Sequence, residues 1–230
     1  MTTKNLLQFA QENWDAYQTT ISVASANTTG ETLVASEKPI YNFDDICKTL
    51  FPEDKRPSSA DGIYFFGSEI HFVEFKSGFK QNVTKKNFDP ERGKCRVEGV
   101  NRVCKDFWDI FWENQDRKIK ELISKIRFKA VDSYIILEKL VLPNCADHLP
   151  GRSSQLVFTV VIDEDGVDGI EDSLADVSQK DVKIDNPLIS IRQSLNRLLK
   201  QKDAKGNDYF YDRIEVLTAT DFEHRLKLTS

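Results

Sequence analysis

The sequence lacks several features that would indicate a zinc knuckle, a membrane span or a secretory leader. Its four cysteines form no Cys-x-x-Cys pair, which argues against a zinc knuckle. Cys145 and His148 do have ligand spacing, so a zinc site with Cys95 and Cys104 stays a less favoured alternative. No apolar run approaches the roughly 20 residues of a membrane span. The N-terminus lacks the long apolar stretch of a secretory leader. We therefore expect a cytoplasmic protein that does not contact a membrane.

A general positive charge is also missing. The chain has 32 Lys and Arg against 37 Asp and Glu, a formal net charge of −5, so its overall charge gives no case for nucleic acid binding. The distribution is more informative. Residues 76–105 carry nine basic residues against three acids, a net of +6, whereas residues 163–185 carry nine acids against two lysines, a net of −7. Such asymmetry indicates either a local electrostatic footprint or a solvated surface.

The remaining patterns predict an α/β fold in which helices flank a mixed β-sheet. The length of 230 residues and the 40% hydrophobic content suit a single domain over 1–230, with a basic insertion or loop at about 77–106. Residues 132–142 fit either a strand or the continuation of the preceding helix. Apolar residues at helical spacing, or β-branched runs typical of buried strands, predict helices over 4–18, 44–50, 115–130 and 186–201 and strands over 155–162 and 213–219.

The most informative stretch is 59–78. Two apolar, aromatic-rich runs flank Gly67-Ser68, which predicts a β-hairpin with a two-residue turn. In that register Asp61 faces Glu74, and because side chains alternate along a strand, Lys76 shares their face. Opposed like charges destabilise a sheet. A bound divalent cation, together with Lys76, is the simplest compensation.

Asp61, followed at hairpin spacing by Glu74-Phe75-Lys76, resembles the core of the PD-(D/E)xK nuclease superfamily. The resemblance implies a restriction-endonuclease-like fold and a metal-dependent endonuclease that hydrolyses phosphodiester bonds in DNA. It implies that Asp61 and Glu74 hold Mg²⁺, with Mn²⁺ as an alternative, and that the Phe75 carbonyl adds a ligand. Lys76 would be the catalytic lysine, which orients or activates the attacking water. Ala60 departs from the family, because the motif has proline there.

Further contacts follow from the same resemblance. Lys80, Lys85 and Lys86 lie in the basic segment and would bind the nucleic acid substrate. A helix before the hairpin often carries another acid to the metal in the resembled family, so Glu12 is a candidate ligand and Glu37 a second. A homodimer is compatible with this reading, because several such cutters need two sites to break both strands.

Two other interpretations stay open. In one, the chain is a catalytically inactive module on the same fold that binds nucleic acid or a protein partner through its basic segment. In the other, it is a protein-interaction module whose acidic segment 163–185 docks a basic partner. A requirement for divalent metal would distinguish the nuclease from the first. Salt-dependent binding of nucleic acid would exclude the second.

Overall fold

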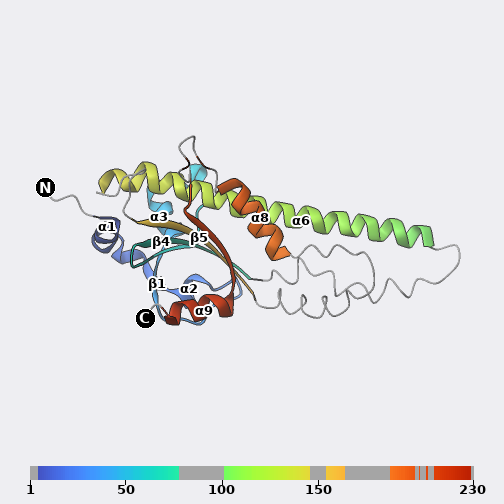
Figure 1. The fold of residues 1–230 in the computed structure, drawn as a ribbon, viewed down its shortest axis with the longest axis horizontal. Helices are drawn as coiled ribbons and strands as arrows, with labels where there is room; N and C mark the ends of the chain where they lie inside the picture. The colour runs from blue at the N-terminus through green and yellow to red at the C-terminus, as the bar shows by residue number, and fades with distance from the viewer. Residues whose placement is uncertain are drawn as a thin grey trace.

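A six-stranded mixed sheet forms the centre of the molecule (Figure 1). The computed structural model describes residues 5–77, 101–145, 154–163, 187–199, 202, 206 and 210–228. The sheet order is β1-β2-β3-β4-β5-β6, antiparallel from β1 to β4 and parallel from β4 to β6. Helices pack on the sheet, so the predicted α/β fold with a mixed sheet is confirmed. Among the described helices, none combines the length and the apolar character that crossing a bilayer requires.

The elements are short except for one helix. The strands are β1 (Gln18–Thr20), β2 (Pro39–Asn42), β3 (Gly62–Phe66), β4 (Glu69–Lys76), β5 (Gln155–Ile162) and β6 (Arg213–Thr218). The helices are α1 (Leu6–Asn13), α2 (Ile21–Ala24), α3 (Phe43–Leu50), α6 (Asn101–Ile136), α8 (Pro187–Leu199) and α9 (Ala219–Leu228). A π-helical turn, Leu137–Val141, continues α6. Turns of 3₁₀-helix occupy Asp15–Tyr17, Glu53–Lys55 and Leu142–Asn144.

Helix α6 differs most from its predicted extent. It starts at Asn101 rather than near 115, so the last residues of the predicted basic insertion belong to a helix. At its other end it runs through Ile136, which decides residues 132–142 in favour of a continued helix. Its 36 residues correspond to about 54 Å. In Figure 1 the C-terminal part of α6 lies over the sheet, while the N-terminal part runs past the sheet edge.

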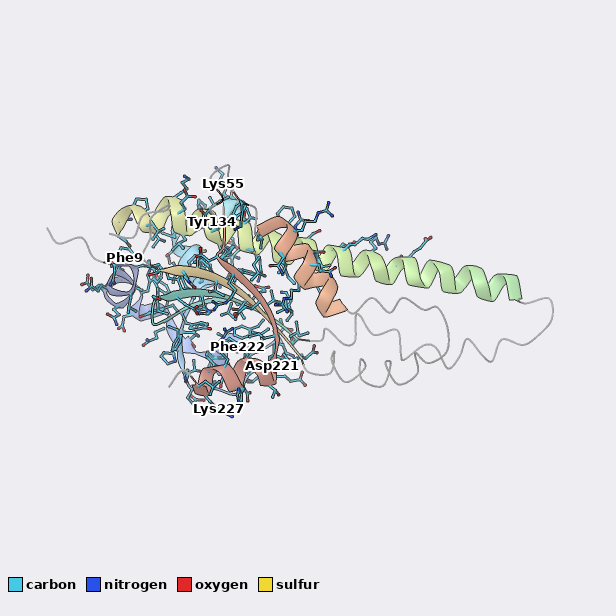
Figure 2. The ribbon with its side chains drawn as sticks, viewed as in Figure 1. Phe9, Lys55, Tyr134, Asp221, Phe222 and Lys227 are labelled. Atoms are coloured by element: carbon cyan, nitrogen blue, oxygen red, sulfur yellow. The ribbon has the colours of Figure 1, made fainter. Side chains whose placement is uncertain are left out.

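The two faces of the sheet bury separate hydrophobic clusters. On β4, Ile70 and Phe72 join the larger cluster, to which α1, α3, α6 and α8 contribute. Val73 and Phe75 face the other way and join the smaller cluster with α9. Figure 2 shows the arrangement through Tyr134 on α6, which lies on one side of the sheet, with Phe222 of α9 on the other. Both faces of β4 are therefore covered, as its apolar sequence predicts.

The hairpin register agrees with the sequence prediction. Phe66 pairs with Glu69, and the ladder continues to Gly62 opposite Val73, so Gly67-Ser68 is the two-residue turn. Gly67 has φ of 53°, a conformation that glycine adopts without steric cost. One step beyond the last pair, Asp61 and Glu74 come together. Glu74 has the parity of Ile70 and Phe72, which places it on the face covered by α6.

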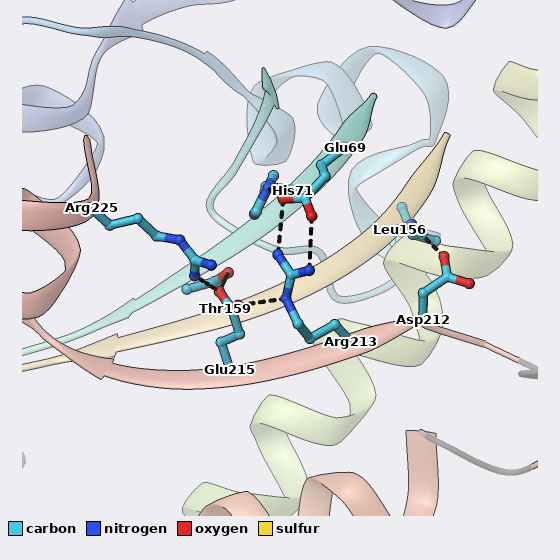
Figure 3. Close-up of polar contacts among 8 residues, drawn as sticks. All are labelled: Glu69, His71, Leu156, Thr159, Asp212, Arg213, Glu215 and Arg225. Carbon is cyan, nitrogen blue, oxygen red and sulfur yellow. Dashed lines mark hydrogen bonds and ion pairs between the residues drawn. The ribbon is translucent and has the colours of Figure 1, made fainter. Parts of the chain in front are cut away.

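A network of ion pairs joins β4 to β6 and α9 at the start of β4 (Figure 3). Arg213 binds the Glu69 carboxylate with two parallel contacts, Nη1 to Oε1 at 2.8 Å and Nη2 to Oε2 at 2.9 Å. Its Nε donates to Glu215 Oε1 at 2.6 Å, and Arg225 pairs with the other Glu215 oxygen. His71 Nε2 lies 2.8 Å from Glu69 Oε2. This network secures the end of β4 that lies away from Glu74.

Candidate active site

The predicted acidic pair lies where β3 begins and β4 ends. Glu74 is fully buried, whereas the side chains of Asp61 and Lys76 are 27% and 25% exposed, so the cluster opens to solvent on one side. Lys76 Nζ forms an ion pair with Glu74 Oε1 at 2.5 Å. The structure thus brings together the three residues that the motif singles out.

A second lysine completes the cluster from helix α6. Lys129 Nζ donates to Asp61 Oδ1 at 2.8 Å and to Glu74 Oε2 at 2.9 Å. One ammonium group therefore bridges both carboxylates. The two oxygens converge on a single cation, and the formal charges of the four side chains balance.

The backbone of β4 fixes the other oxygen of Asp61. The Phe75 N–H donates to Asp61 Oδ2 at 2.7 Å, and the Phe75 ring anchors the strand against Phe222 on the opposite face, with ring centroids 6.0 Å apart. The N–H and C=O of one strand residue point to the same side. The Phe75 carbonyl therefore faces the β3 side of β4, where Asp61 lies, as a third ligand would require.

Helix α6 holds the segment that leads into Asp61. The Ser58 N–H donates to Asp132 Oδ2 at 3.0 Å, and the Ala60 N–H donates to Ser133 Oγ at 2.8 Å. Lys129, Asp132 and Ser133 are spaced i, i+3 and i+4, so they share one helical face. This face positions the segment and the carboxylate pair together. It also accounts for the departure from the motif, because proline in place of Ala60 could not donate.

Replacing Ala60 with proline, the residue that the resembled motif has at this position, is expected to destabilise the fold by about 1–3 kcal/mol. The substitution removes the N–H that the fully buried Ser133 hydroxyl accepts. Urea unfolding of the Ala60→Pro chain measures the cost. In a Ser133→Ala background the bond is already absent, so the same substitution should cost less. Equal costs in both backgrounds would show that ring sterics, and not the lost bond, are responsible.

Burial and charge perturb the two most enclosed groups in the cluster. Burial raises the pKa of Glu74 to about 7, and the neighbouring Asp61 carboxylate adds to this shift, while Lys76 and Lys129 oppose it. For Lys129, burial acts to lower the pKa, but the Glu74 and Asp61 carboxylates outweigh it and leave the pKa raised. Perturbed carboxylates of this kind are enriched at functional sites.

The donor atoms at this site fit a divalent cation. Asp61 Oδ1 and Glu74 Oε2 already converge on one positive charge, and hard cations such as Mg²⁺ prefer carboxylate and carbonyl oxygens. Mg²⁺ is commonly held by one or two carboxylates, with water and substrate phosphate completing the shell. Within the described part of the chain, however, no three His, Cys, Asp or Glu side chains gather into one group. The protein would therefore supply two carboxylates and at most a carbonyl.

Of the other residues predicted for the site, the two acids do not join its carboxylates in the described part of the chain. Glu12 is exposed on α1, and Glu37 is exposed before β2; neither forms a three-acid group with Asp61 and Glu74 among the described residues. The three predicted substrate lysines, Lys80, Lys85 and Lys86, lie outside the described residues.

Sequence reasoning did not assign Lys129, Asp132 and Ser133 to the site. In the sequence, Lys129 is one of several basic residues on the helix predicted over 115–130. The available signal was the i, i+3, i+4 spacing of three polar residues beside Ala130, which is fully buried. Searches of protein-family models, of curated proteins and of solved structures found no match to this chain.

Proposed function

We propose that this chain is a metal-dependent nuclease with a restriction-endonuclease-like core that hydrolyses phosphodiester bonds in DNA. The observation that carries the proposal is the convergence of Asp61 and Glu74 on one cation position beside Lys76. The site lies where β3 begins and the largely buried strand β4 ends, with one side open to solvent. The order of a hairpin, a covering helix and a further parallel strand also fits the resembled family.

Each residue of the site would have a separate role in the proposed reaction. Asp61 and Glu74 would hold the divalent cation, and the Phe75 carbonyl, on the β3 side of β4, would add a ligand. When bound, such a cation polarises a phosphoryl oxygen and lowers the pKa of a bound water. Lys76 keeps its ammonium beside Glu74 Oε1 and is partly exposed, so it can donate to the attacking water or to a phosphate oxygen at the open side. Burial of Glu74 shields the pair from bulk water on its other side.

The direct test is cleavage of labelled single- and double-stranded DNA with Mg²⁺, Mn²⁺ or EDTA. Cutting should need the metal, and Asp61→Asn and Lys76→Met should each lower the rate by about 10²–10⁴-fold, as loss of a metal ligand or a proton-handling group does. Lys120→Met is the matched control, because Lys120 is exposed on α6. Thermal melting of each variant checks that it is folded. Cutting that persists in EDTA, or in both site variants, would contradict the proposal.

One observation favours a second candidate, the catalytically inactive nucleic-acid-binding module. Lys76 and Lys129 already neutralise the carboxylate pair, so the structure accounts for the pair without a metal. In that case DNA binding should be insensitive to EDTA and should weaken with salt. Asp61→Asn should leave its affinity for DNA unchanged.

A further inference from the structure

Lys129 occupies the point at which the two site carboxylates meet. Its Nζ lies 2.8 Å from Asp61 Oδ1 and 2.9 Å from Glu74 Oε2, and its side chain is 27% exposed. The motif formed by Asp61 and Glu74-Phe75-Lys76 contains no such residue, because Lys129 comes from helix α6, far along the chain. A divalent cation held by the same two oxygens would lie close to the position of this ammonium.

We propose that Lys129 is a tethered counter-ion that holds the carboxylate pair until a divalent cation replaces it, and that the displaced ammonium then binds the substrate phosphate. The first part concerns the cation position alone, whereas the second part rests on the proposed nuclease function.

Mutual exclusion of the two cations follows from geometry and charge. Mg²⁺ binds oxygen at about 2.1 Å. The Lys129 ammonium touches both oxygens that would be the ligands, so metal and ammonium together would place like charges in contact inside a partly buried site. Coulomb repulsion at such a separation is strong at the low effective dielectric of a protein. One cation must therefore leave when the other enters.

The displaced ammonium cannot go far, because helix α6 is fixed beside it. Ala130 is fully buried, and Asp132 and Ser133 hold the segment before Asp61. Only the flexible four-carbon stem of Lys129 can move. Since one side of the cluster is open, the ammonium would remain next to the metal on the side where a phosphate approaches. Lysine serves as a point charge for phosphate in such positions.

Calorimetric titration of the full chain with Mg²⁺ or Ca²⁺, without DNA, tests the competition. Lys129→Met should bind the metal at least about tenfold more tightly than wild type, because the competing charge is gone. It should also melt earlier than wild type in EDTA and gain more in melting temperature from Ca²⁺. Lys120→Met should behave as wild type. Equal or weaker metal affinity in Lys129→Met would overturn the competition while leaving the nuclease proposal intact. If none of the chains bound metal, both would fall.

The salt dependence of DNA binding tests the second role. With Ca²⁺ in place of Mg²⁺, the affinity of wild type for a DNA duplex should fall with salt, and Lys129→Met should reduce the slope of log affinity against log salt by about one. Lys129→Arg should restore the slope. An unchanged slope in Lys129→Met would show that the displaced ammonium does not reach a phosphate, and would overturn this part.

Discussion

Replacing Glu74 with glutamine is expected to stabilise the metal-free fold at pH 8 while removing the proposed nuclease activity. Glu74 is fully buried, and burial together with the Asp61 carboxylate raises its pKa from 4.5 to about 7. Lys76 and Lys129 face the same group and lower its pKa, but they do not offset burial. The ionised side chain is therefore less favourable in the folded chain than in water. Glutamine has nearly the same shape and carries no charge.

The sign of the pH dependence follows from the raised pKa. Between pH 4.5 and about 7 the folded chain binds more protons at Glu74 than the unfolded chain does, so stability falls as pH rises through this window. Below pH 4.5 both states are protonated at this group and the full contribution is present. Above pH 7 it is lost. The pKa rise from 4.5 to about 7, at about 1.4 kcal/mol per pKa unit, means that the ionised carboxylate costs at most about 3.5 kcal/mol relative to a neutral side chain.

Urea unfolding in EDTA at pH 5 and pH 8 measures this difference. Wild type should lose stability from pH 5 to pH 8 relative to Glu74→Gln, with a smaller gap between the two chains at the lower pH. Glu121→Gln, at an exposed position on α6, is the control and should give no such gap. Equal or lower stability of Glu74→Gln at pH 8 would mean that the two lysines more than compensate for burial, and the explanation would be wrong.

A gain in stability in Glu74→Gln would indicate that the Glu74 carboxylate serves function rather than the fold. A buried carboxylate beside a second carboxylate is retained at a cost in stability that a neutral residue would avoid. A residue that lowers stability, at a position where a single substitution would raise it, is expected to serve function. Enhanced stability and lost cleavage in one variant would link the two observations.

The arrangement of the carboxylate pair could be predicted because it depends on local rules. A two-residue turn sets the register of a hairpin, and side-chain alternation then sets the face. Together these determine that Asp61, Glu74 and Lys76 meet. Strand β5 was predictable for a similar reason, since its β-branched residues suit only a buried strand. Strand β2 has four residues and starts at Pro39, so it carries too little pattern to be recognised.

The contribution of α6 could not be predicted, because it depends on tertiary packing. The apolar stripe shows which face of a helix turns inward, but not which residues of the sheet that face will meet. Lys129 lies beside the inward stripe, 55 residues from Glu74 and 68 from Asp61 in the chain. Ala60 likewise departs from the resembled motif in the sequence, and only the structure shows that its N–H donates to Ser133 Oγ. Both facts depend on where α6 lies on the sheet.

Replacing Arg213 with methionine is expected to lower the free energy of unfolding by about 2 kcal/mol at pH 7, which is less than the roughly 3–5 kcal/mol for a broken buried ion pair because the arginine is partly exposed. Glu69 and Glu215 would lose the guanidinium that lies between them. Urea unfolding measures the loss. Arg213→Lys should recover only part of it, because lysine cannot form the two parallel contacts.

The pH dependence of stability shows which ionisable group is responsible for the stabilisation by this network. Mainly through its hydrogen bonds to Arg213, with a further contribution from His71, the pKa of Glu69 falls from 4.5 to about 2, against the effect of burial. Because the folded pKa is the lower one, this stabilisation is present above pH 4.5 and disappears as pH falls towards 2. Glu215 and Arg225 complete the group of charges around it. Arg213→Met should therefore differ less from wild type at pH 3 than at pH 7.

Arg213→Met also tests whether the ion-pair network affects metal binding at the carboxylate pair. Glu69 and Glu74 are five residues apart on β4, or about 17 Å, and Phe72 and other buried residues lie between them. Arg213→Met should thus leave metal affinity unchanged even though the chain is less stable. A change in metal affinity would show that β4 transmits strain from the ion-pair network to the carboxylate pair. The network would then support the site as well as the fold.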